Sequence, residues 1–218
     1  MASFGKLLFV CGLSGSGKTT LGELLKNNDN FVHFNVDVWA FGGDPVGESA
    51  AVPGPEMIAK RDPDIKAAFD HMAANGFSKL SAGEVTEFSA WEPFFSRLYP
   101  AILSAREAAG ADKDMVVTFS VYLRSIRDYL RQHLGESLIF VVLNPSVDSV
   151  GFRKVAHLKN TAAARGQTLS QFLRSFHPDS DAPDIEESVL VGILTEQARA
   201  GGKGFEPAFP DEMRTLAV

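Results

Sequence analysis

The sequence predicts an α/β fold in which a parallel β-sheet carries helices on both faces. Short apolar runs of the kind that form buried strands alternate with stretches of helical spacing. Such alternation implies β-α-β units, whose connecting helices cover both faces of a parallel sheet. The chain has 218 residues, of which 45% are apolar and 22% charged, and this suits one large domain.

Four segments have the pattern of strands. They are short apolar runs that stop at Gly-rich, polar or Asn-Pro sequence, and they cover residues 6–11, 31–37, 115–120 and 137–143. The second segment ends in a carboxylate, Asp37. A sheet of this kind should have a fifth strand near the C-terminus, but no segment there has the pattern of one.

Seven segments have the spacing of helices, and they cover residues 19–25, 56–74, 90–109, 123–134, 147–158, 168–176 and 184–200. Gly and Pro are frequent in residues 41–55, which predicts a loop, and a break is expected near residues 75–83. The tail from Gly201 is also rich in Gly and Pro, and no element is predicted there.

Composition narrows the class of partner. The net charge of −6 argues against a protein that binds nucleic acid or a membrane surface, because both need a concentrated basic face. No stretch approaches the ~20 apolar residues of a membrane helix, and the opening residues lack the pattern of a secretion signal. The single cysteine, Cys11, suits a reducing compartment. We therefore expect a cytoplasmic protein, a monomer or homodimer, with a small-molecule partner.

Residues 12–19 read GLSGSGKT and match the phosphate-binding loop pattern G-x-x-x-x-G-K-[ST] at every fixed position. Glycines in this loop let successive backbone amides point at phosphates, and the following helix adds its positive end. Lys18 is expected to reach the β- and γ-phosphates and Thr19 to bind Mg²⁺. The sequence thus predicts a P-loop NTPase fold, a three-layer sandwich that binds ATP and Mg²⁺. The predicted nucleotide-binding residues are Gly12, Ser14, Gly15, Ser16, Gly17, Lys18, Thr19 and Thr20.

Two large classes of P-loop protein do not fit. GTPases read guanine with N-K-x-D after a late strand, whereas residues 144–148 here read NPSVD. Motor-type ATPases carry an acid after a late apolar strand, whereas the third predicted strand ends in TFS. Asp37 follows Lys18 by nineteen positions and is expected at the carboxyl edge of the sheet, beside the loop. There it can orient an acceptor hydroxyl, take its proton or hold Mg²⁺ through water, or it can simply cap the next turn.

The loop and its spacing to Asp37 resemble small-metabolite kinases of the shikimate kinase and gluconokinase group. Three segments are similar to gluconokinases: GLSGSGKTT, KLSAGEVTEFSAWEPFFSRL and SVYLRSIRDYLR, at residues 12–20, 79–98 and 120–131. The resemblance implies phosphoryl transfer from ATP to a small-molecule hydroxyl. It covers most of residues 6–175, and only the first segment is highly specific.

The residues expected to bind the acceptor differ from those of gluconokinases. Gluconokinases follow the second-strand Asp with a His-Pro pair, whereas Ala40 and Phe41 stand at those places here. Their acidic cluster before a Pro is replaced by FSAW at residues 88–91, and about thirty extra residues intervene between residues 42 and 75. We therefore predict one domain over residues 1–218 with a helical insertion at about 42–110 that caps the acceptor side. The predicted acceptor is not gluconate.

Four arginines complete the predicted site. Kinases of this kind bring cations to the migrating phosphoryl group from a lid, which we place at about residues 153–166 with Arg153 and Arg165 as catalytic residues. Arg124 and Arg127 follow the third predicted strand, where they can meet a substrate anion. Each of these cations can equally belong to a solvated helix face.

Two other functions remain open. One is a nucleoside or nucleotide kinase, in which residues 42–110 would form a base-binding cap. The other is a nucleotide-binding module whose acceptor pocket has decayed, because the family's His-Pro and Asp-Arg elements are missing. Acceptor-dependent ADP release separates these possibilities.

Overall fold

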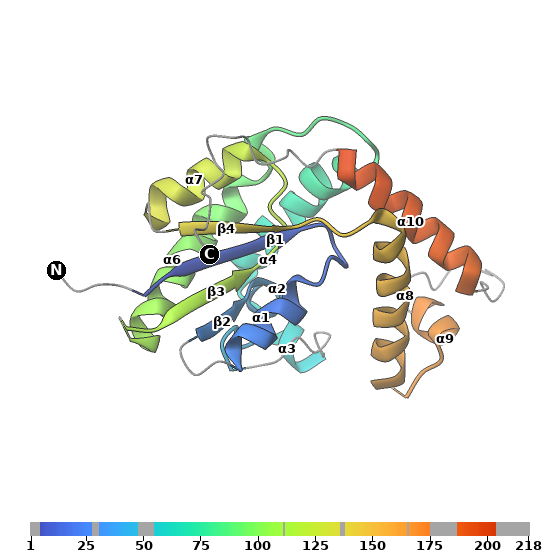
Figure 1. The fold of residues 1–218 in the computed structure, drawn as a ribbon, viewed down its shortest axis with the longest axis horizontal. Coiled ribbons are helices and arrows are strands. Elements are labelled where there is room, and N and C mark those ends of the chain that lie inside the picture. Colours follow the sequence, from blue (N-terminus) through green and yellow to red (C-terminus); the bar gives the residue numbers. More distant parts are fainter. Residues whose placement is uncertain are drawn as a thin grey trace.

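Four parallel strands form one sheet in the computed structural model, in the order β2-β3-β1-β4 (Figure 1). The strands are β1 (Leu7–Gly12), β2 (Phe31–Asn35), β3 (Asp114–Thr118) and β4 (Leu138–Leu143). The structure describes residues 5–27, 31–47, 55–110, 112–135, 138–164, 166–174 and 187–203. Within those ranges the sheet has no fifth strand. The predicted α/β fold with a parallel sheet is confirmed.

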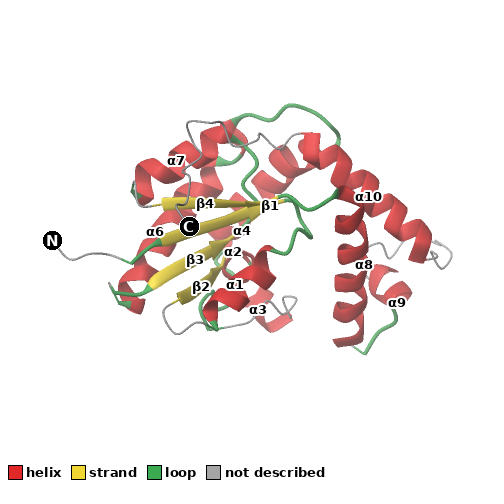
Figure 2. Cartoon of the chain, viewed as in Figure 1, coloured by secondary structure: helices red, strands yellow, loops and turns green. Residues whose placement is uncertain are grey.

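Helices cover both faces of the sheet (Figure 2). Helix α1 (Lys18–Lys26) packs on one face, against β1, β2 and β3. The other face carries the hydrophobic core, to which α6 (Glu92–Ala109) and α7 (Arg124–Leu134) contribute buried side chains. Strand residues alternate between these faces, so that Phe34 enters the core while its neighbour His33 lies under α1. Because of this alternation, the polar side chain of His33 lies on the α1 side of the sheet and not in the core.

The segment between β2 and β3 is almost wholly helical. It comprises α2 (Val36–Ala40), α3 (Pro55–Ala59), α4 (Pro63–Met72), a π-helical turn η1 (Ala73–Phe77), α5 (Ser78–Ser81), a 3₁₀ turn η2 (Phe88–Ala90) and α6. Side chains from α4, α5 and α6 belong to the same buried cluster as those of the strands. The segment therefore shares the core of the sheet.

Two predicted boundaries in this segment are wrong, for identifiable reasons. The helix predicted over residues 56–74 is interrupted, because Asp62 precedes a proline and caps a new helix, accepting from the amides of Asp64 and Ile65. The break predicted near residues 75–83 is helical as far as Ser81. Gly76 does not end the helix: a Cβ there would lie 2.8 Å from the Trp91 ring, so the glycine allows close packing.

The C-terminal helices stand beside the carboxyl ends of the strands (Figure 1). They are α8 (Val147–Ala164), α9 (Leu169–Arg174) and α10 (Glu187–Lys203). Helix α8 continues through the polar segment predicted to follow it, and α10 packs against both α8 and α5. At Gly151 of α8 a Cβ would collide with Thr195 of α10, so the two helices cross closely. No helix in the described ranges has the length and apolarity needed to cross a bilayer.

Gly22 in α1 gives a direct test of how this helix sits on the sheet. A Cβ at Gly22 would lie 2.7 Å from Cε1 of the buried His33 ring, whose two nitrogens are both hydrogen-bonded. We expect Gly22→Ala to lower the free energy of unfolding, because overpacking costs about 1–3 kcal/mol and exceeds the ~1 kcal/mol gain in helix propensity. Urea denaturation measures this difference.

Gly192 supplies the matched control for that substitution. It also lies inside a helix, α10, and no atom comes within 4 Å of the position of an added Cβ. Gly192→Ala is therefore expected to raise or preserve stability. Equal stabilisation by both substitutions would contradict the packing of α1 on His33.

Candidate active site

The glycine-rich loop joins β1 to α1 at the carboxyl edge of the sheet. Three of its glycines have a positive φ: 146° at Gly12, 83° at Gly15 and 99° at Gly17. Residues with a side chain rarely adopt these conformations, which turn the backbone around the start of α1. The loop borders a cleft of about 1130 Å³, and Ser14, Thr19 and Thr20 also line it. The structure thus gives the loop the form that a phosphate cradle requires.

Lys18 lies at the base of this loop with its side chain buried. Its Nζ donates to the carbonyl oxygen of Gly12 at 3.1 Å and to that of Leu13 at 2.9 Å. Burial lowers the pKa of Lys18 from 10.5 to about 8, although the charges of Asp37 and Cys11 oppose this shift. A bound phosphate would place a negative charge beside the buried Lys18 ammonium.

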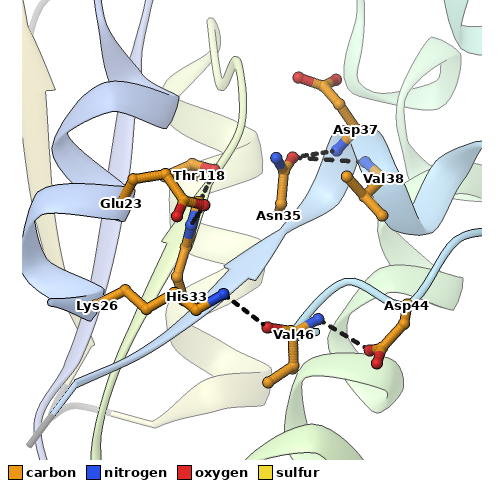
Figure 3. Close-up of polar contacts among 9 residues, drawn as sticks. All are labelled: Glu23, Lys26, His33, Asn35, Asp37, Val38, Asp44, Val46 and Thr118. Atoms are coloured by element: carbon orange, nitrogen blue, oxygen red, sulfur yellow. Dashed lines mark hydrogen bonds and ion pairs between the residues drawn. The ribbon is translucent and has the colours of Figure 1, made fainter. Parts of the chain in front are cut away.

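Asp37 reaches the cleft from the first turn of α2 and not from the end of the strand as predicted. Strand β2 stops at Asn35, whose side-chain oxygen accepts from the amides of Asp37 at 3.1 Å and Val38 at 3.4 Å (Figure 3). An asparagine that caps a helix in this way ends the strand and begins the helix. The cap uses the backbone of Asp37 and leaves its carboxylate projecting away from Asn35 into the cleft.

The surroundings of Asp37 only partly disfavour the ionised form of its carboxyl group. The side chain is exposed to the water of the cleft, although the phosphate loop and α8 line the same cleft. Desolvation therefore raises the pKa of Asp37, while the charges of Lys18 and His157 oppose the rise. Because water still reaches the carboxyl group, we expect it to be ionised at neutral pH. An ionised carboxylate facing a cation is suited to accept a proton.

A buried hydrogen-bond chain supports the floor of the cleft. His33 of β2 contacts Glu23 of α1 through Nδ1 and Thr118 of β3 through Nε2, both at 2.9 Å (Figure 3). Burial lowers the pKa of His33, and the hydrogen bond and charge of Glu23 oppose this. The chain ties α1 to two strands, and Glu23 also lines the cleft. Sequence reasoning missed it, because these residues show no common spacing.

Helix α8 brings Arg153, Lys154 and His157 to the cleft. Arg153 Nη1 donates to the carbonyl oxygen of Ser16 at 3.1 Å, which places the guanidinium against the phosphate loop. Lys154 and His157 also line the cleft, and burial lowers the pKa of Lys154. The structure therefore brings Arg153 together with Lys18, Thr19 and Asp37. Arg165, the second predicted lid residue, lies outside the described residues.

The two arginines predicted to meet substrate do not line the cleft. Arg127 is buried, 1% exposed, and its Nη1 lies 3.5 Å from the carbonyl oxygen of Tyr122. Arg124 pairs on the helix surface with Asp128, Nε to Oδ2 at 3.3 Å. Helix α7 packs its Arg127 side into the protein, so the expected anion contact has no support in this arrangement.

Aromatic side chains form the part of the cleft that sequence reasoning did not find. Phe69, Phe77, Phe119 and Tyr122 line it together with Ser120. Burial raises the pKa of Tyr122, and its interactions with the Ser120 side chain and with the backbone of Ser14 in the phosphate loop oppose the rise. These residues come from α4, η1 and the segment after β3, and only the fold brings them together.

The donor atoms at the loop suit Mg²⁺ better than a transition metal. The Thr19 hydroxyl and the Asp37 carboxylate both line the cleft, and Mg²⁺ prefers oxygen ligands. The buried Ser16 hydroxyl, also in the loop, has no hydrogen-bond partner. Among the described residues no three His, Cys, Asp or Glu side chains form a metal cluster. A magnesium ion here would share its coordination between a few protein oxygens and phosphate.

Comparisons with known proteins find similarity to solved structures only. No protein-family model and no curated protein matches the chain. A gluconokinase from Sinorhizobium meliloti 1021 is 19% identical with a TM-score of 0.38, and the alignment covers 93% of this chain and 94% of that one. A sugar kinase from Janibacter sp. HTCC2649 is 18% identical with a TM-score of 0.42, with coverage of 91% and 98%. Assignment of an activity therefore depends on the geometry of the cleft.

Proposed function

We propose that the chain transfers the γ-phosphoryl group of ATP to the hydroxyl group of a small molecule. The observation that carries the proposal is that Lys18 and Asp37 line one cleft, where the charge of each opposes the effect of burial on the pKa of the other. Lys18 belongs to a loop of the form that holds phosphates, while Asp37 comes from a separate element and is exposed. A protein that only bound nucleotide could use this carboxylate to hold Mg²⁺, whereas a kinase can also use it to accept the proton of an acceptor hydroxyl.

Each group has a defined role in the proposed reaction. Loop amides and Lys18 hold the β- and γ-phosphates, and the acceptor hydroxyl approaches between them and Asp37. The acceptor oxygen forms a bond to the γ-phosphorus, and the bond from that phosphorus to the β-γ bridging oxygen breaks, which releases ADP. Asp37 takes the hydroxyl proton. Arg153, one turn before His157 on α8, lies where it can neutralise charge on the transferring group.

Thr19 and Asp37 are the residues that would hold Mg²⁺ with the phosphates. When bound, the ion neutralises phosphate charge and fixes the geometry of the nucleotide. Asp37 can hold Mg²⁺ instead of taking the proton. It can also do both, if a bound water lies between its carboxylate and the ion. Proton transfer and Mg²⁺ binding predict different effects when Asp37 is substituted.

A screen of acceptor-dependent ADP release tests the proposal. Sugars, sugar acids, nucleosides, nucleoside monophosphates and other alcohols are supplied with ATP and Mg²⁺, and ADP is measured. Release that depends on one acceptor class supports the kinase. A second candidate, a nucleoside kinase, is favoured by the aromatic side chains of the cleft, on which a base can stack. Tight ATP binding without release for any acceptor would instead indicate a nucleotide-binding module.

The depressed pKa of Lys18 predicts that ATP binding takes up a proton in mildly alkaline solution. In the empty protein the amine begins to lose its proton near its pKa of about 8. Bound phosphates favour the ammonium, so ATP affinity is expected to fall with rising pH above that value, by up to about tenfold per unit. Calorimetry at pH 8.5 in buffers of different ionisation enthalpy measures the uptake. Identical binding enthalpies in all buffers would contradict it.

A further inference from the structure

The charged groups of the cleft are unevenly distributed. Its described lysines and arginines are Lys18, Arg153 and Lys154, and all three belong to the phosphate loop region or to α8, which also contributes His157. Arg153 contacts the loop carbonyl of Ser16, and a Cβ at Gly15 would lie 2.9 Å from Cγ of Lys154. These two cations therefore lie against the phosphate loop, on the donor side of the proposed reaction. The segment between β2 and β3 contributes no cation to the cleft within the described residues.

The side of the cleft formed by that segment and by the residues after β3 is aromatic. It consists of Phe69, Phe77, Phe119 and Tyr122, which we call the aromatic wall. Phe77 packs on Phe119 with ring centroids 6.3 Å apart and on Tyr122 at 5.6 Å. The same segments also contribute the polar side chains of Asp37 and Ser120 to the cleft. They thus supply apolar ring faces, the hydroxyls of Ser120 and Tyr122, and one carboxylate.

The wall is held in a fixed position relative to the phosphate loop. Phe94 links Phe69 to Phe119, with centroid distances of 5.7 Å and 5.3 Å, and it is fully buried. At the other end, Tyr122 is largely buried, and its interaction with the backbone of Ser14 opposes the rise in its pKa. Rings packed into the core and tied to the loop form a preorganised surface, which binds a complementary flat face at low entropic cost.

One nearby cation does not alter this charge pattern. The Arg61 guanidinium lies over the rings of Phe41 at 4.8 Å and Phe69 at 5.0 Å. Its Nε and Nη2 atoms are buried without a hydrogen-bond partner, and Arg61 does not line the cleft. Phe69 lines the cleft and Arg61 does not, so a ligand there meets the ring without lining contacts from the guanidinium.

We propose that the acceptor is an uncharged alcohol with an aromatic or similarly flat apolar face, which packs on the aromatic wall while its hydroxyl meets Asp37. An anionic acceptor would place a carboxylate or phosphate beside the Asp37 carboxylate and against apolar rings, while Lys18, whose charge acts on Asp37, is occupied by the donor phosphates in the proposed reaction. This inference rests on the proposed kinase function and specifies its acceptor class. Nucleosides fall inside the class, whereas sugar acids and nucleoside monophosphates fall outside it.

Matched acceptor pairs test the inference with the full chain, ATP and Mg²⁺. The pairs are 1-phenyl-1,2-ethanediol with mandelate, adenosine with AMP, and glucose with gluconate. We expect kcat/KM for ADP release to be at least about tenfold higher for the uncharged member of the first two pairs. Preference for the anionic members would overturn the inference while leaving the kinase intact. If neither the uncharged nor the anionic acceptors cause ADP release although ATP is bound, the proposed function itself is contradicted.

Substitutions in the wall give a second, independent readout. Phe77→Ala is expected to raise KM for the preferred aromatic acceptor at least about tenfold with little change in ATP affinity, and Phe77→Leu to do so less. Phe152→Ala is the matched control, because Phe152 is exposed on α8 and does not line the cleft. Trp91 packs on Phe77 at 4.9 Å, so its fluorescence also reports acceptor binding without turnover. An unchanged KM in a folded Phe77→Ala protein would overturn the inference.

Discussion

Replacing Lys18 with alanine is expected to lower kcat/KM by about 10³-fold, the upper range for loss of one preorganised charge-stabilising donor. The Lys18 ammonium is buried beside the phosphate loop and lies within the electrostatic reach of Asp37. No other described cation contacts the Gly12 and Leu13 carbonyls to which Lys18 donates. ADP release with a saturating acceptor measures the loss, and ATP titration separates binding from transfer.

The same substitution is expected to leave the fold intact. Burial disfavours the charged form of Lys18, as its lowered pKa shows, so at neutral pH the ammonium does not stabilise the folded state. Stability linked to this group rises as pH increases from about 8 towards 10.5, where the unfolded chain binds the extra proton. Lys66→Ala, at an exposed position paired with Asp70, is the control and should change neither activity nor stability appreciably. Full turnover in Lys18→Ala would show that the loop assignment is wrong.

The donor half of the site could be predicted because its parts are contiguous. A strand, a Gly-rich turn and a helix occupy residues 7–26 without interruption, so the local pattern carries nearly all the geometry. Asp37 was identified correctly as lining the same cleft, although its element was assigned wrongly. The apolar pattern of β2 continues to Val38, and nothing in it indicates that the Asn35 side chain would cap a helix.

The acceptor half could not be predicted, because distant segments assemble it. Phe69 and Phe119 are linked through Phe94, on a third element, and no sequence spacing relates them. Arg127 matched a family motif but turned inward, since helix orientation depends on packing against the sheet and not on the motif.

Replacing Asp37 with asparagine is expected to lower kcat by about 10²–10⁴-fold, the usual contribution of a positioned general base. Asparagine keeps the size of the side chain, and the Asn35 cap uses only the backbone amide at this position, so α2 should be preserved. ATP affinity is expected to be unchanged or tighter, because a negative charge near the phosphates is removed. Asp70→Asn, on the exposed surface of α4, is the control for loss of a carboxylate.

The pH dependence and the Mg²⁺ dependence of this variant distinguish the roles open to Asp37. Desolvation raises its pKa above the ordinary value of 3.8, so the acidic limb of kcat/KM should lie above that value and disappear in Asp37→Asn. The raised pKa also means that the folded protein gains stability as pH falls through this region, so Asp37→Asn should not be less stable at neutral pH. If Asp37 chiefly holds the ion, the variant will instead need more Mg²⁺ and recover activity at high concentration. Unchanged kcat at every pH and Mg²⁺ concentration would leave Asp37 with only a structural role in α2.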